Sequence, residues 1–91
     1  MGTVKVIIPE SFLVASGGID EIETHGSTIE ECLKEAVEKA PALQKLWFTS
    51  EGGLSKYVML CLNGENIPRK DLFQLVKDGD EIMPLLVIGG G

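Results

Sequence analysis

The chain has 91 residues, enough for one small domain. It has no apolar run near the ~20 residues of a membrane span, and residues 1–15 lack the pattern of a signal peptide. We therefore expect a cytoplasmic protein. Hydrophobic residues make up 44 % of the sequence, and a net charge of −6 with scattered basic residues argues against nucleic acid or a membrane surface and favours a basic or neutral protein partner. Two cysteines, Cys32 and Cys61, are too few for a disulfide framework, a four-cysteine zinc site or an iron–sulfur cluster, so no metal site is expected.

The first part of the chain predicts two strands joined by a long loop. Residues Thr3–Pro9 are rich in β-branched side chains, and the closing proline cannot donate a ladder hydrogen bond. Ser16-Gly17-Gly18 marks a turn, and Ile19–Thr24 follows as a second, partly exposed strand. We therefore expect a hairpin at the start of the domain.

A helix is predicted over Thr28–Ala40. Ser27 or Thr28 can cap its first turn, because each is followed three residues later by a glutamate. Pro41 ends it, since the residue before a proline resists helical geometry. Its apolar residues repeat at helical spacing and form one stripe: Ile29, Cys32, Leu33, Ala36, Val37 and Ala40.

The second half of the chain predicts a further turn of helix and three strands. Residues 42–48 can form the extra turn, and the short apolar segment Tyr57–Leu62 is typical of a buried strand. Asn63-Gly64 is a strong hairpin signal, which makes Glu65–Pro68 a short return strand. A single helical turn within residues 71–76 and a tight turn at residues 78–80 lead into the last strand, Glu81–Ile88.

This order of elements predicts an α+β protein with the β-grasp fold, a mixed sheet of four to five strands with one main helix packed across one face. The helix has only one apolar stripe, so it can cover only one face of the sheet. Residues 1–88 form the domain and residues 89–91 a separate tail. Pro84 lies within the last strand, where a proline removes a ladder donor, so we expect a bulge or an early end to regular pairing there.

The face of the sheet opposite the helix is predicted to bind a partner. Because side chains alternate along a strand, the residues between those that face the helix point away from it. No second helix is available to cover them, and exposed apolar patches usually mark interfaces. The predicted partner-binding residues are Met59, Cys61, Met83, Leu85 and Ile88.

The sequence ends in Gly89-Gly90-Gly91, directly after the apolar strand. Three glycines can lie extended in a channel too narrow for side chains. A terminal carboxylate has a pKa of about 3.5 and is ionised at neutral pH, which makes it a poor electrophile until it is activated. Its attack on the α-phosphate of ATP would give an acyl-adenylate that a sulfur nucleophile can open. The tail therefore predicts a reactive end that enzymes act upon.

Two motifs resemble those of the β-grasp sulfur carriers, a family that includes the small subunit of molybdopterin synthase and the sulfur carriers of thiamine and cysteine biosynthesis. One is Leu62-Asn63-Gly64-Glu65, at the end of a strand and its turn. The other is Asp78-Gly79-Asp80-Glu81-Ile82, followed by an apolar strand and the glycines. The resemblance covers essentially the whole chain.

This resemblance implies that Gly91 carries a thiocarboxylate, with Gly90 beside it in the partner's channel. An ATP-dependent adenylating enzyme of the ubiquitin-activating kind would form it, and a sulfur-accepting synthase would use it. The chain would then be a protein co-substrate rather than an enzyme, with no bound cofactor. Three glycines instead of two, and a long segment over residues 40–56, leave the biosynthetic pathway open.

Two other functions are compatible with the sequence. A ubiquitin-like protein modifier would use the same activated glycine to form isopeptide bonds with lysines. A non-conjugating β-grasp binding module would leave the tail without a role. The mass of the protein from its host distinguishes the first, and addition of one residue after Gly91 distinguishes the second.

Overall fold

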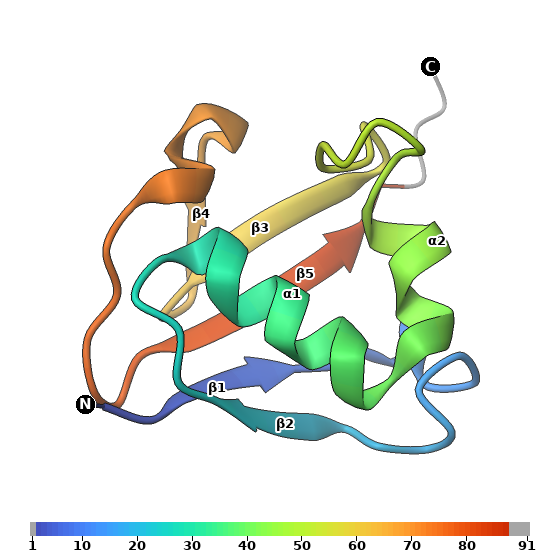
Figure 1. The fold of residues 1–91 in the computed structure, drawn as a ribbon, viewed down its shortest axis with the longest axis horizontal. Coiled ribbons are helices and arrows are strands. Elements are labelled where there is room, and N and C mark those ends of the chain that lie inside the picture. The colour runs from blue at the N-terminus through green and yellow to red at the C-terminus, as the bar shows by residue number, and fades with distance from the viewer. Residues whose placement is uncertain (1, 88–91) are drawn as a thin grey trace.

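A computed structural model describes residues 2–87, and over this range five strands form one mixed sheet with a helix lying across one face (Figure 1). The strands are β1 (Val4–Ile7), β2 (Glu21–Thr24), β3 (Val58–Leu62), β4 (Glu65–Ile67) and β5 (Glu81–Leu86). The helices are α1 (Ile29–Lys39), the short α2 (Gln44–Trp47) and the 3₁₀ turns η1 (Glu10–Phe12), η2 (Pro41–Leu43) and η3 (Arg69–Phe73). None of the helices within this range is long and apolar enough to cross a bilayer.

The strand order is β2-β1-β5-β3-β4, which confirms the predicted β-grasp arrangement. β1 pairs antiparallel with β2 and parallel with β5, and β3 pairs antiparallel with both β5 and β4. The first and last strands of the chain therefore lie side by side at the centre of the sheet, and β2 and β4 form its edges.

The main helix lies where its sequence pattern predicts it. Thr28 is the N-cap, and its Oγ1 accepts a hydrogen bond from the backbone N–H of Glu31 at 3.2 Å. The Glu31 carboxylate reaches back to the N–H of Ser27, at 2.8 Å, so the reciprocal bond of the capping box is shifted one residue outward. Ala40 ends the helix immediately before Pro41.

The core lies between α1 and the covered face of the sheet. Leu33 is fully buried, as predicted, and Trp47 is buried against Phe12 in an edge-to-face contact with ring centroids 5.9 Å apart. The short helices η1 and α2 thus extend the core beyond α1. The buried residues of α1 and the strands are Val4, Val6, Ile22, Ile29, Cys32, Leu33, Ala36, Val37, Val58, Leu60 and Ile82.

Pro84 does not produce a bulge, so that part of the prediction is wrong. The antiparallel register of β3 and β5 is regular through the pair Leu60–Pro84. Val87 donates its N–H towards β3, and alternation along the strand turns the nitrogen of Pro84 to the other side, towards β1. Pairing with β1 does end early, at Ile82, so the missing N–H removes no ladder bond.

Candidate functional site

The outer face of the sheet, opposite α1, carries an apolar block from two neighbouring strands. The register pairs Met59 with Leu85 and Cys61 with Met83, so these four side chains form one continuous patch. All four are half-buried, whereas the residues between them, such as Leu60, are buried beneath α1. Their orientation is the one that strand alternation predicts, and their role in binding a partner stays a prediction.

The same patch continues past the ends of the two strands. Val87 donates its backbone N–H to the carbonyl oxygen of Tyr57 at 2.7 Å, which carries the register of β3 and β5 one residue beyond the pair Val58–Leu86. The Tyr57 and Val87 side chains are 55 % and 40 % exposed. Continuing the alternation by one step along each strand would have identified both from the sequence. We define the outer apolar face as Tyr57, Met59, Cys61, Met83, Leu85 and Val87.

Acidic residues border this face on the side of β1 and β2. Lys5 of β1 is paired in register with Glu23 of β2 and Glu81 of β5, and its ammonium lies 3.5 Å from the carboxylate of Glu21. Three glutamates therefore flank one lysine on this face, and one of them forms an ion pair with it. This excess of negative charge is complementary to a partner whose apolar surface has a basic rim.

The two sequence motifs meet in space at the opposite end of the sheet from Val87. The Asn63 side-chain amide donates to Asp80 Oδ1 at 3.0 Å, while Asn63 Oδ1 accepts from the N–H of Glu81 at 2.9 Å. Asp80 is only 5 % exposed, and its other oxygen accepts from the N–H of Lys77 at 2.9 Å. These bonds to Asn63 and Lys77 hold the pKa of the Asp80 carboxyl below its ordinary value. The sequence motifs are thus one structural clamp between the β3–β4 turn and the start of β5.

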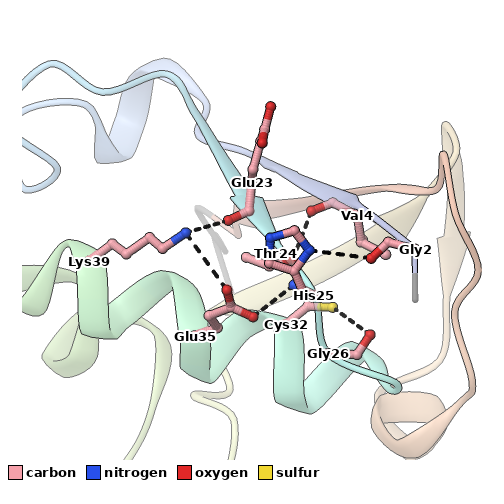
Figure 2. Close-up of polar contacts among 9 residues, drawn as sticks. All are labelled: Gly2, Val4, Glu23, Thr24, His25, Gly26, Cys32, Glu35 and Lys39. Atoms are coloured by element: carbon pink, nitrogen blue, oxygen red, sulfur yellow. Dashed lines mark hydrogen bonds and ion pairs between the residues drawn. The ribbon is translucent and has the colours of Figure 1, made fainter.

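Cys32 and His25 lie beside the edge strand β2, in contacts that explain them structurally (Figure 2). The Cys32 thiol is buried and donates to the carbonyl oxygen of Gly26 at 3.6 Å, and its burial raises the pKa of the thiol. A thiol in this environment is a poor nucleophile. One imidazole nitrogen of His25 lies 3.4 Å from the carbonyl oxygen of Gly2. Within residues 2–87, no three His, Cys, Asp or Glu side chains are grouped to hold a metal ion.

Two hollows in the surface are both open and carry mixed side chains. One lies along α1 and the edge of β2. The other lies beside Tyr57, near the end of β5, and its remaining lining residues are Gln44, Lys45, Phe48, Thr49, Ser50 and Ser55. The hollow along α1 mixes three glutamates, Glu31, Glu35 and Glu38, with Lys34 and Lys39, and the other hollow has only Lys45 as a charged residue, so neither presents charge of one sign to an ionic ligand. The outer apolar face is therefore the stronger candidate site.

The predicted reactive end lies outside the described residues. Ile88 and Gly89-Gly90-Gly91 belong to this part of the chain, and so does the predicted boundary between domain and tail. Val87 is the last described residue, and it belongs to the outer apolar face. The structure therefore places the root of the tail beside the predicted partner surface.

Comparisons with known proteins agree with this geometry. The family model described as the ThiS family matches residues 12–91. A search of curated protein sequences gave no match. Among solved structures, the chain is similar to small archaeal modifier protein 1 (SAMP1) of Methanosarcina acetivorans, at 30 % identity and a TM-score of 0.84, covering 100 % of this chain and 98 % of that one.

Two further structures show the same fold. SAMP1 of Haloferax volcanii is 22 % identical with a TM-score of 0.85, covering 99 % of this chain and 100 % of that one. A chain from the BexX/CysO complex of Amycolatopsis orientalis is 28 % identical with a TM-score of 0.79, covering 97 % of this chain and 99 % of that one. The likeness thus extends over nearly the full length of each protein.

Proposed function

We propose, from the premise that this chain belongs to the ThiS family, that it is a sulfur carrier whose last glycine, Gly91, is adenylated with ATP and converted to a thiocarboxylate. The observation that carries the proposal is the family match itself, which includes most of the β-grasp domain and continues through Gly91. The ubiquitin-like fold shared with SAMP1 and CysO is the fold of small carrier and modifier proteins, which supports a role as substrate rather than catalyst.

The chemistry needs little from the carrier beyond a reactive atom. The Gly91 carboxylate attacks the α-phosphate of ATP in the active site of an adenylating enzyme, and pyrophosphate leaves. Hydrosulfide (HS⁻) then attacks the carbonyl carbon of the acyl-adenylate, AMP leaves with the electron pair of the broken C–O bond, and loss of the S–H proton gives the thiocarboxylate. Glycines at positions 89 to 91 allow this end to enter a narrow channel. The chain itself binds no cofactor in this scheme, because ATP is held by the partner.

Two partners follow from this scheme, an adenylating enzyme and a synthase that accepts the sulfur. We propose that the outer apolar face docks the adenylating enzyme, with Met59, Cys61, Met83 and Leu85 at its centre and Ile88 leading into the tail. The half-buried methionines suit a surface that meets more than one partner, because their side chains adapt to different shapes. The synthase would belong to cytoplasmic molybdopterin, thiamine or cysteine biosynthesis.

Deletion of Gly91 tests the proposed reacting position. The shortened chain still ends in two glycines but reaches about 3.3–3.6 Å less far. Misplacement by about 1 Å at a reacting centre can cost on the order of a hundredfold in rate, so we expect adenylation to be severely impaired. The measurement is ATP-dependent release of pyrophosphate with the host's adenylating enzyme. Full activity of the shortened chain would show that Gly91 is not the reacting residue.

Protein modification is the second candidate function, and one observation favours it. The relative from Methanosarcina acetivorans, which is 30 % identical, is named a modifier protein. Intact mass spectrometry of the protein from its host separates the two functions. A carrier gains the mass difference between sulfur and oxygen on its terminal glycine, whereas a modifier gives a series of larger conjugates joined to lysines. Both outcomes require the same activated glycine.

A further inference from the structure

Arg69 is the single arginine of the sequence, and it lies at the end of the sheet where β3 begins. It opens η3, directly after β4 and Pro68. The register of β3 and β4 pairs Leu60 with Ile67, so two residues further on Arg69 stands opposite Val58. The last pair of β3 and β5 is Val58–Leu86, which places Arg69 at the same end of the sheet as the root of the tail.

The Arg69 guanidinium binds three backbone carbonyl groups of the loop that enters β3. Its Nη2 donates to the carbonyl oxygen of Leu54 at 2.6 Å, and its Nη1 donates to those of Ser55 at 2.8 Å and Val58 at 3.1 Å. Only arginine carries several N–H donors in one rigid plane, so a lysine cannot reproduce all three bonds. One side chain thus fixes both ends of the Leu54–Val58 segment.

Tyr57 lies inside this segment and holds the last described residue of the chain. Its carbonyl oxygen accepts the N–H of Val87 at 2.7 Å, the final ladder bond before Ile88. The N–H of Tyr57 in turn bonds to Ser55 Oγ at 3.2 Å, and the N–H of Val58 bonds to the Ser55 carbonyl oxygen at 3.1 Å. The position of Val87 therefore depends on a turn whose carbonyl groups are held by Arg69.

We propose that Arg69 is a positioning residue for activation of the tail. By fixing the Leu54–Val58 segment it fixes the point and the direction in which the chain leaves the sheet at Val87. This inference rests on the proposed function, in which Gly91 must reach the α-phosphate of ATP in the partner's active site. Arg69 acts on Tyr57 and Val87 at the margin of the outer apolar face and not on Met59, Cys61, Met83 and Leu85 at its centre, so its loss should change how the tail is presented more than how the domain docks.

The test compares Arg69→Ala and Arg69→Lys with Lys70→Ala, which changes the neighbouring exposed residue. Amide hydrogen exchange of Val87 should accelerate at least tenfold in Arg69→Ala, while exchange of Cys61 in the middle of β3 stays within twofold of the native rate. In adenylation assays with the host's enzyme, kcat should fall at least tenfold with KM unchanged. The exchange rate and kcat of Arg69→Lys should lie between those of Arg69→Ala and the native protein. Millimolar methylguanidinium should restore part of the kcat of Arg69→Ala. Lys70→Ala should match the native protein in every assay.

Unchanged exchange at Val87 in Arg69→Ala would overturn the proposed coupling. Faster exchange at Val87 with unchanged kcat would overturn the positioning role, as would a rise in KM alone. Equal acceleration at Cys61 and Val87 would show that Arg69 acts only on global stability, and this too would overturn it. The Gly91 deletion separates this inference from the proposed function. If that deletion is fully active, Gly91 is not the reacting residue, whatever the exchange rate at Val87.

Discussion

Asn63, in the turn between β3 and β4, does more than shape that turn. Asn63 has a φ of 53° and Gly64 a φ of 86°, the left-handed geometry of a tight hairpin turn. Asn63 tolerates this φ and also uses both atoms of its side-chain amide, one on Asp80 and one on Glu81. A glycine at position 63 would keep the turn and lose the clamp, so the two roles can be separated.

Asp80→Asn should reduce stability at neutral pH, and the loss should shrink in acid. The bonds from Asn63 and Lys77 lower the pKa of Asp80 in the folded chain, so its stabilising contribution is present above the unfolded-state pKa, about 3.9, and is lost as the pH falls through the lower folded pKa. The substitution replaces an acceptor oxygen with a donor facing an N–H. We expect a cost of about 1–3 kcal/mol at neutral pH.

Urea unfolding between pH 7 and pH 2 measures this difference. Asn63→Gly should show a smaller loss with the same trend, because one of the two bonds to Asp80 remains. Asp20→Asn, at an exposed carboxylate, serves as the control and should change little at any pH. A difference between native protein and Asp80→Asn that grows as the pH falls would contradict the assignment.

The two ion pairs on the charged face of α1 differ in their further contacts. Two i,i+4 ion pairs, Glu30–Lys34 and Glu35–Lys39, both have an N–O distance of 3.7 Å. Only the second also binds the free edge of β2, where Lys39 donates to the Glu23 carbonyl oxygen at 2.6 Å and Glu35 accepts from the N–H of His25 at 2.7 Å (Figure 2). These bonds occupy backbone groups that an added strand would use, a common protection of edge strands.

Lys39→Ala should therefore destabilise the protein more than Lys34→Ala. An i,i+4 ion pair contributes about 0.2–0.5 kcal/mol, and we expect Lys39→Ala to cost roughly 1 kcal/mol more because it also loses a hydrogen bond from a charged donor. Urea unfolding of both variants gives the comparison. Glu35→Ala should in addition accelerate amide exchange of His25, and Glu30→Ala should not. Equal stability of the two lysine variants would show that the contact with β2 contributes nothing.

The sequence predicted the elements of the whole molecule better than the contacts between them. Hydrophobic periodicity, the cap at Thr28 and the Asn63-Gly64 turn are local signals, so they predicted the elements and the β-grasp order. The clamp at Asp80 and the role of Arg69 depend on which strands become neighbours, and no local pattern specifies this. Pro84 was expected to cause a bulge or an early end to regular pairing, and the bulge is absent because the missing N–H faces β1, a direction that sequence alone does not tell.

At the scale of the whole molecule, the sheet order places the centre of the outer apolar face on β3 and β5, the two strands whose last ladder bond holds Val87, so a partner docked there lies beside the root of the tail. Replacing Met83 and Leu85 with glutamate should abolish adenylation, because two carboxylates would be desolvated in the interface. The fold should persist, since both side chains lie on the face that α1 does not cover.

Val14→Glu with Leu75→Glu is the matched control, because these side chains are 95 % and 75 % exposed and lie outside the outer apolar face. Circular dichroism should show both double variants folded, and pyrophosphate release should be lost only in the first. Native activity of the Met83 and Leu85 variant would exclude this face as the docking surface.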